Sequence, residues 1–187
     1  MTTWKLDAAH TQVNFSAKHM MVTTVRGTFH DVQGTIELDE EDPTRSRGEF
    51  TVAAASVDTN FGARDAHLRS ADFFDAETYP TITFVSTAIT QTADDEFDVT
   101  GDLTIKDVTR PATFKVELTG IVQGMGGQRH AGLEASTKLQ RSDWGLDWNV
   151  ALEQGGWLVG KEIRLEIAVA ADEVAAAEAP ELVASAS

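Results

Sequence analysis

Apolar and polar residues alternate with a period of two along most of the first 170 residues. Between residues 4 and 21, Val13, Phe15 and Ala17 fall on one face of an extended chain, with polar residues between them. Such alternation is typical of strands with one buried face, and it predicts about eight of them. The segments with this pattern are 4–21, 25–29, 32–38, 50–54, 82–89, 97–105, 114–120, 131–139 and 157–169.

The phase of this alternation slips by one residue at two places, His30-Asp31 and after Phe84. A slip moves every following side chain to the other face, so each predicts a β-bulge or a bend. Asp107–Pro111 and Gly124–Gly127 are rich in turn residues and are predicted turns. Lys161 shares the inward phase of the last strand, which indicates either a polar group facing the interior or another bulge.

Long antiparallel strands with one apolar face either stack as a sandwich or close into a barrel. Closing about eight strands leaves an interior that holds side chains or one small ligand. Small residues recur at inward positions, which favours a cavity over a filled interior. They are Ala17, Gly27, Gly34, Ala54, Gly101, Gly120, Ala131 and Ala135. We therefore predict an all-β fold, an extended antiparallel eight-stranded β-barrel, with the sandwich as the alternative.

The segment Asp58–Phe84 departs from this pattern, because it combines ionisable residues with aromatic ones. Ala63–Ser70 lacks proline and β-branched residues and follows residues that often cap helices, so it is predicted to be helical. Tyr79 precedes Pro80 and is therefore expected to be extended. We predict a short helical insertion around residues 61–75 and expect specificity to reside there.

The chain length suits a single domain, which we place at residues 1–170. Residues 171–187 are an acidic, alanine-rich segment of low complexity without aromatic residues. Such a composition predicts a disordered tail.

Composition and charge exclude several classes of function. The chain has no cysteine, so it has no disulfides and no thiolate chemistry. Its formal charge of −15 argues against binding to nucleic acid or to an anionic membrane surface. The N-terminus lacks a basic region followed by an apolar run, and no segment approaches the roughly twenty apolar residues of a membrane span. We expect a cytoplasmic protein without stable membrane insertion.

The sequence contains no convincing catalytic set or metal site. Asp65 and His67 lie two residues apart and would face different sides of a helix, and the five histidines lack the spacing of a zinc motif. Ser70 lies on no nucleophile elbow, and no glycine-rich phosphate loop precedes a helix. We therefore expect neither an enzyme nor a metalloprotein.

A ligand site is better supported. Arg64, His67 and Arg69 on the predicted helix could bind a diphosphate, a carboxylate or a quinone oxygen at the mouth of an apolar tunnel. Alternatively, the two arginines pair with the aspartates of the insertion and only fix its conformation. Both interpretations remain open on the sequence alone.

The chain resembles the YceI-like family of polyisoprenoid-binding, lipocalin-like proteins over residues 4–170. The resemblance rests on several motifs together, which are far more specific than any one of them. They are W-x-L-D-x-x-H-T-x-V-x-F-x-x-x-H (4–19), V-R-G-T-F (25–29), S-V-D-T-N (56–60), R-D-x-H-L-R-S-x-D-F-F-D (64–75), Y-P-x-I-T-F-x-S (79–86), G-D-L-T-I-K-D-V-T-R-P (101–111) and R-S-D-W-G (141–145).

This resemblance implies a lipocalin-like barrel with an elongated apolar tunnel for an isoprenoid chain or a similar amphiphile, such as an isoprenoid quinone. The resemblance also implies that the protein can form a homodimer. We expect the protein to require no cofactor. Asp65, His67 and Arg69 match the family's insertion motif, and Trp144 takes the place of a phenylalanine in the late motif.

We predict a carrier or storage protein for such a lipid. The residues predicted to contact the ligand are Phe15, His19, Phe29, Ile36, Phe50, Arg64, His67, Leu68, Phe84, Leu103, Phe114, Leu133, Trp144 and Val159. One alternative is an enzyme that acts on the bound lipid with Asp65 and His67 as acid and base. The other is an interaction domain without a ligand, whose own side chains fill the barrel.

Overall fold

The computed structural model describes residues 1–175 and shows one antiparallel sheet with a single α-helix in that part of the chain. The helix is α1 (Gly62–Arg69), and three short 3-10 turns are η1 (Pro43–Arg45), η2 (Ala54–Ser56) and η3 (Arg141–Trp144). The strands are β1 (Thr2–Leu6), β2 (Gln12–His19), β3 (Thr23–Phe29), β4 (Val32–Leu38), β5 (Arg47–Ala53), β6 (Val57–Asp58), β7 (Thr81–Gln91), β8 (Glu96–Ile105), β9 (Val108–Gln123), β10 (Arg129–Gln140) and β11 (Val159–Glu173).

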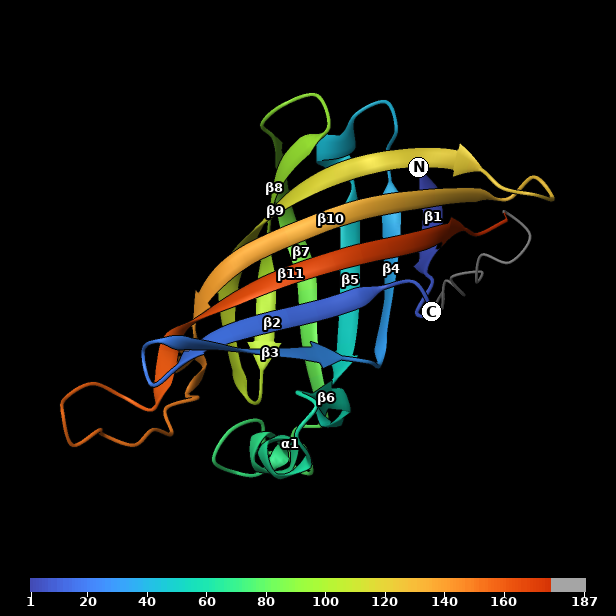
Figure 1. The fold of residues 1–187 in the computed structure, drawn as a ribbon. Coiled ribbons are helices and arrows are strands. Elements are labelled where there is room, and N and C mark those ends of the chain that lie inside the picture. The colour runs from blue at the N-terminus through green and yellow to red at the C-terminus, as the bar shows by residue number, and fades with distance from the viewer. Residues whose placement is uncertain (176–187) are drawn as a thin grey trace, which may run out of the picture.

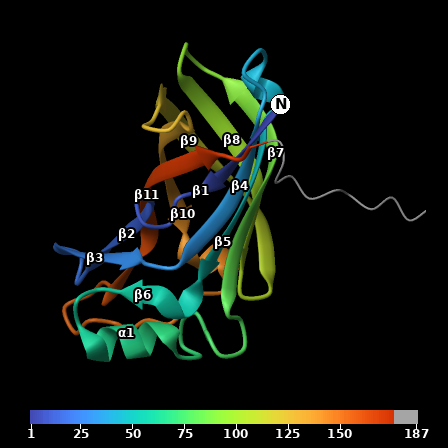
Figure 2. The same cartoon turned by 90° about the vertical axis from the view of Figure 1, so that its right-hand side faces the viewer.

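Eight of these strands close into a barrel, as predicted. Their order is β1-β4-β5-β7-β8-β9-β10-β11, and β11 pairs back onto β1. Strands β2, β3 and β6 continue the sheet beyond β11 as an arm. In Figure 1, β10, β11, β2 and β3 cross in front of β4, β5 and β7, and Figure 2 shows these two layers from the side. The closed barrel, rather than the sandwich, is therefore the observed architecture.

Two strands, β2 and β1, pair one after the other with the same edge of β11. Its residues Val159–Ala168 pair with β2, and Ala171–Glu173 pair with β1. At the junction, the amide of Ala170 donates to the hydroxyl of buried Thr11 (3.2 Å), and its carbonyl accepts from the amide of Asp7 (2.9 Å). These bonds replace the strand-to-strand hydrogen bonds that are missing where β1 gives way to β2. The backbone groups of Ala170 therefore remain paired.

The last strand of the barrel extends past residue 170, where we predict the domain to end. β11 continues to Glu173, and Ala171 is almost fully buried, because these residues pair with β1 and β10. Alternation ends at this point in the sequence, but partner strands on both sides keep the backbone extended. The rest of the predicted tail, from residue 176 onward, lies outside the described residues.

Both slips in the apolar pattern coincide with irregularities. β3 ends at Phe29 and β4 begins at Val32, and the two residues between them turn the chain from the arm into the barrel wall. The register of β7 against β8 shifts between Ser86 and Ala88, which is the expected bulge. Another shift, between Val159 and Ile163 in β11, leaves Lys161 exposed, so Lys161 is not a polar group of the interior.

The insertion between β5 and β7 covers one end of the barrel with β6 and α1, whereas η1 lies at the opposite end (Figure 1). The helix spans Gly62–Arg69, close to the predicted range, but its N-cap is Phe61 and no side chain caps it. A turn at residues 71–74 follows the helix. No helix in residues 1–175 is long and apolar enough to cross a membrane.

Candidate functional site

The barrel encloses a cavity of about 640 Å³ that extends from the η1 end to the α1 end. Aliphatic and aromatic side chains from nearly every strand form its wall. Of its ionisable residues, Glu40 and Arg47 flank η1 and Arg64 and His67 belong to α1. Lys18, His19 and Arg141 also line it. The volume is within the range of pockets that enclose a small organic ligand.

Three phenylalanine rings lie against glycines of neighbouring strands. A β-carbon at any of these glycines would clash with the ring, so only glycine permits so close an approach. The pairs are Phe15 with Gly27, Phe50 with Gly34 and Phe84 with Gly101. The inward glycines thus leave volume that the protein's own rings partly occupy. The rings lie along the wall, and the lumen remains open as a cavity.

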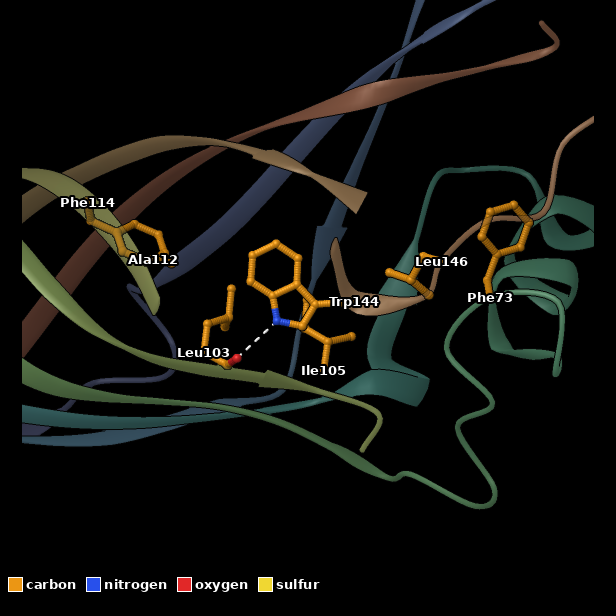
Figure 3. Packing of buried hydrophobic residues seen from close by; sticks show 7 residues of the cluster. All are labelled: Phe73, Leu103, Ile105, Ala112, Phe114, Trp144 and Leu146. Atoms are coloured by element: carbon orange, nitrogen blue, oxygen red, sulfur yellow. Dashed lines mark hydrogen bonds between the residues drawn. The ribbon is translucent and has the colours of Figure 1, made fainter. Parts of the chain in front are cut away.

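At the α1 end, an apolar cluster packs between the barrel and the insertion (Figure 3). Trp144 on η3 is almost fully buried in it, and its indole N–H donates to the carbonyl of Leu103 at 3.0 Å. The single polar group of Trp144 is therefore already satisfied. Trp144 therefore contributes an apolar surface to the cavity. The members of the cluster are Phe73, Leu103, Ile105, Ala112, Phe114, Trp144 and Leu146.

A buried chain of hydrogen bonds fixes Arg64 at the cavity. The side chain of Asp65 accepts the amide (2.8 Å) and the hydroxyl (2.5 Å) of Thr59. The guanidinium of Arg64 in turn donates to the hydroxyl (2.7 Å) and carbonyl (2.9 Å) of Thr59 through Nε and Nη2. Within residues 1–175, no carboxylate lies within 4.0 Å of Arg64, so its pairing with an aspartate is not observed.

Arg69 takes no part in the cavity. Its Nε donates to the carbonyl of Ala55 at 2.8 Å and its Nη2 to that of Val57 at 2.9 Å, so it ties α1 to the segment before β6. Of the two arginines of the helix, one therefore fixes the insertion and the other also lines the cavity.

His67 lies at the same mouth, in contact with aromatic rings. Its Nε2 is 2.8 Å from the carboxylate of Asp72, and its ring meets those of Phe73 (5.1 Å) and Trp148 (4.5 Å) edge to face. In the alternative enzymatic interpretation, Asp65 and His67 are the acid and the base. Each has a different partner, since Asp65 accepts from Thr59 and His67 contacts Asp72. The structure thus does not bring the two together as a hydrogen-bonded pair.

Arg141 lines the cavity and was not among the predicted site residues, although it begins the motif R-S-D-W-G. Its guanidinium is buried and donates to the carbonyls of Leu146, Trp148 (3.0 Å) and Gly160 (2.9 Å). Burial lowers the pKa of Arg141 below its ordinary value. These bonds hold the connection 145–158 against the start of β11, and Arg141 itself lines the cavity. Its inward position could have been inferred only from three-dimensional contacts, because η3 has no strand alternation.

Every residue predicted to contact the ligand lies on the wall or mouth of this one cavity. These are Phe15, His19, Phe29, Ile36, Phe50, Arg64, His67, Leu68, Phe84, Leu103, Phe114, Leu133, Trp144 and Val159. Their contact with a ligand remains a prediction. Within residues 1–175, no three histidine or acidic side chains gather in a way that could hold a metal ion.

The comparisons agree with this architecture. UPF0312 proteins from Staphylococcus aureus strains MSSA476 and MW2 are 36% identical over 167 residues, which cover 89% of this chain and 95% of theirs. The crystal structure of the Campylobacter jejuni YceI protein, 31% identical, superposes with a TM-score of 0.73 over 91% of this chain and 97% of that one. A polyisoprenoid-binding domain from Saccharophagus degradans, 13% identical, shares the fold with a TM-score of 0.69 over 93% and 100%. The model of the YceI-like domain matches residues 4–171, and the chain belongs to this family.

Proposed function

We propose that the protein binds a long apolar amphiphile, an isoprenoid of the polyprenyl or isoprenoid-quinone type, and acts as its carrier or store. The observation that carries this proposal is the 640 Å³ cavity, whose wall is mostly aliphatic and aromatic. A ligand that fills such a cavity must be apolar over most of its length, because a buried polar group without a partner would be costly.

The apolar wall also accounts for the expected affinity. Burying a hydrocarbon chain yields roughly 0.8 kcal/mol per CH₂ group, so the chain supplies most of the binding free energy. Arg64 and His67 lie where a head group would emerge, and a guanidinium or an imidazole can bond to a phosphate, carboxylate or quinone oxygen there. The relative from S. degradans supports this ligand class, since it is described as polyisoprenoid-binding.

The side-chain contacts at the α1 end of the cavity favour a carrier or storage role over an enzymatic one. Chemistry on the lipid would need an acid and a base that are free to meet the substrate. Asp65 is 7% exposed, and its carboxylate already accepts two bonds from Thr59. His67 lies beside Asp72 and two aromatic rings. These contacts hold the insertion in place at the end of the tunnel.

The test is organic extraction of the purified protein followed by mass spectrometry, with two matched variants on β10. Ala135 lines the cavity, whereas Ser136 points to the outer face of the same strand. Ala135→Trp fills the lumen and is expected to lower the extracted lipid at least tenfold, and Ser136→Trp to leave it unchanged. Circular dichroism checks that both variants keep their β-structure.

A stoichiometric isoprenoid that is lost only in Ala135→Trp supports the proposal. Retention of the lipid in folded Ala135→Trp would show that it binds outside the barrel. If the wild-type extract is empty and the apo protein does not take up a long-chain polyprenyl alcohol in vitro, the proposal is wrong and the interaction domain is favoured.

A further inference from the structure

The turn between β2 and β3 exposes three consecutive apolar side chains. Met20 is 49% exposed, Met21 65% and Val22 78%. Across from them, Val150 and Trp157 in the connection before β11 are also about half exposed. Such a patch on a protein surface marks a site of interaction when its residues are contiguous.

The two segments are joined into one surface. The amide of Met20 donates to the carbonyl of Leu158 at 2.8 Å, and the side chain of Met21 lies against Gly156, where a β-carbon would clash with its sulfur. Figures 1 and 2 both show the β2–β3 turn and this connection at the same end of the molecule. We call Met20, Met21, Val22, Val150 and Trp157 together the apolar tip.

The backbone of this turn is strained for the residues it carries. Met20 (φ 49°) and Met21 (φ 65°) are both left-handed, a conformation that suits glycine or asparagine and is unfavourable for other residues. Two methionines at these positions therefore do not serve the turn itself. Strain of this kind is retained where the side chains have a function.

The charge around the apolar tip differs from that of the whole chain. Residues 8–30 contain no aspartate or glutamate, although the chain has 30 acidic residues and a net charge of −15. The hairpin carries Lys18 and Arg26, and β11 adds Lys161 and Arg164. The carboxylates of the adjoining segments are Asp147, Glu153, Glu162 and Glu166; Glu162 pairs with Lys138 at 3.3 Å and Glu166 with Arg164 at 3.9 Å, so this end is close to neutral in a strongly acidic chain. An anionic surface repels the rest of the molecule, so the protein would approach such a surface with this end first.

The apolar tip is also continuous with the cavity. His19 precedes Met20 and Leu158 follows Trp157, and both line the cavity, as does Val159. A hydrocarbon layer in contact with the apolar tip would thus lie beside the mouth formed by Arg64 and His67.

We propose that the apolar tip docks reversibly on an anionic phospholipid bilayer, and that the apolar ligand enters and leaves the cavity at this contact. The proposal deepens the proposed function by naming the partner from which the ligand is taken, and its second half rests on that function. Exposed methionine, valine and tryptophan side chains suit the boundary between head groups and acyl chains, and lysine and arginine suit anionic head groups.

The test is flotation of the delipidated protein with vesicles of equal parts phosphatidylcholine and phosphatidylglycerol. The double variant Met20→Asn/Met21→Gly removes both thioether side chains and installs residues that favour the left-handed turn. It should remain folded and bind the vesicles at least tenfold more weakly. Met125→Ser is the matched control, because Met125 is fully exposed in the β9–β10 hairpin. That hairpin lies about 40 Å away, some thirteen residues along β11 from the apolar tip.

Fluorescence supplies a second measurement. Trp4 and Trp144 are buried, and Trp148 is half-buried against His67 and Phe73, whereas Trp157 is 48% exposed. Vesicles should therefore shift the emission of the wild type to the blue and leave that of Trp157→Phe unchanged. Equal binding by the wild type and the double variant, or equal loss in Met125→Ser, would overturn the docking. So would self-association that depends on Met20 and Met21 without any response to vesicles.

The outcomes separate docking from ligand binding. A wild-type protein that carries an isoprenoid but ignores vesicles refutes the docking and leaves the proposed function standing. A protein that binds vesicles through the apolar tip but neither yields nor takes up an isoprenoid supports the docking and refutes the proposed ligand.

Discussion

The carboxylate of Asp65 is the buried group on which the insertion depends. It accepts both the amide and the hydroxyl of Thr59, and that hydroxyl accepts from Arg64. Removing the acceptor would leave two buried donors unpaired, which costs more than the hydrogen bonds contribute net. The position of Arg64 at the cavity is therefore set by its neighbour in the helix.

We expect Asp65→Ala to lower the free energy of unfolding by about 2–3 kcal/mol, the cost of unpaired donors beside a former charged acceptor. Asp65→Asn keeps one acceptor oxygen at nearly the same volume, so its loss should be about 1 kcal/mol. Urea denaturation of the three proteins at pH 7 measures these differences. Equal stability of the alanine variant and the wild type would mean that Thr59 finds other acceptors and that Asp65 has no structural role.

The lining residues could be predicted from the sequence, but the polar partners of the mouth could not. Phe15, Phe50 and Phe84 follow the inward phase of their strands, so alternation alone assigns them to the interior. The bond from Trp144 to the carbonyl of Leu103 joins residues 41 positions apart. No local pattern encodes such a pairing, because it depends on how the chain closes.

At the scale of elements, Arg141 connects η3, the loop 145–158 and the first residues of β11. It donates to carbonyls on both sides of the loop without a carboxylate within 4.0 Å in the described residues. A guanidinium suits this position, since its planar fork presents several donors at fixed angles. Asn149 supports the same loop, because its side-chain nitrogen donates to the carbonyl of Val159 and its side-chain oxygen accepts from the amide of Val159.

Arg141→Lys is expected to destabilise the protein by about 2 kcal/mol, because one ammonium cannot reach all these carbonyls. Hydrogen exchange should accelerate chiefly between residues 145 and 160. Lys138→Arg, an exposed change on β10, is the control and should alter neither quantity. If hydrogen exchange in the loop is unchanged in Arg141→Lys, Asn149 alone is enough to hold the loop in place.

Alternation in the sequence predicts some irregularities of the strands correctly and does not predict others. The bulge in β7 follows from the slip after Phe84, because one extra residue reverses the phase. The predicted turn at Asp107–Pro111 is wrong, since the turn is at Lys106-Asp107 and β9 begins at Val108. Pro111 is tolerated within β9 because β10 pairs with β9 only from Lys115 onward. Turn composition alone could not reveal that missing neighbour.

At the scale of the whole molecule, several carboxylates are held ionised by local donors. The Asn60 amide, followed by His30, lowers the pKa of Asp58, and the Arg129 fork at 2.7 and 2.8 Å lowers that of Glu40. In the opposite sense, Asp7 raises the pKa of His10. In addition to these local effects, the net charge of −15 destabilises the folded protein by self-repulsion.

These shifts predict a stability maximum between about pH 4.5 and 6.5. A carboxylate with a lowered folded pKa contributes stability above its unfolded value, 3.8 for Asp and 4.5 for Glu, and loses it as the pH falls through the folded value. His10, with a raised pKa, contributes fully below 6.5 and loses its contribution as the pH rises through the folded value. Self-repulsion also grows as groups deprotonate, so both effects lower stability on the alkaline side.

Thermal unfolding measured from pH 3 to pH 9 should therefore give a peaked curve. Because the side chain of His10 is 76% exposed, the alkaline limb should be shallow, and His10→Gln should flatten it further. Salt at 0.5 M should also flatten it, since the self-repulsion is screened over distances of a few ångströms. The acid limb should persist in His10→Gln, because it depends on the carboxylates rather than on His10. A melting temperature that stays constant down to pH 3 would contradict the assignment of Asp58 and Glu40 as stabilising ions.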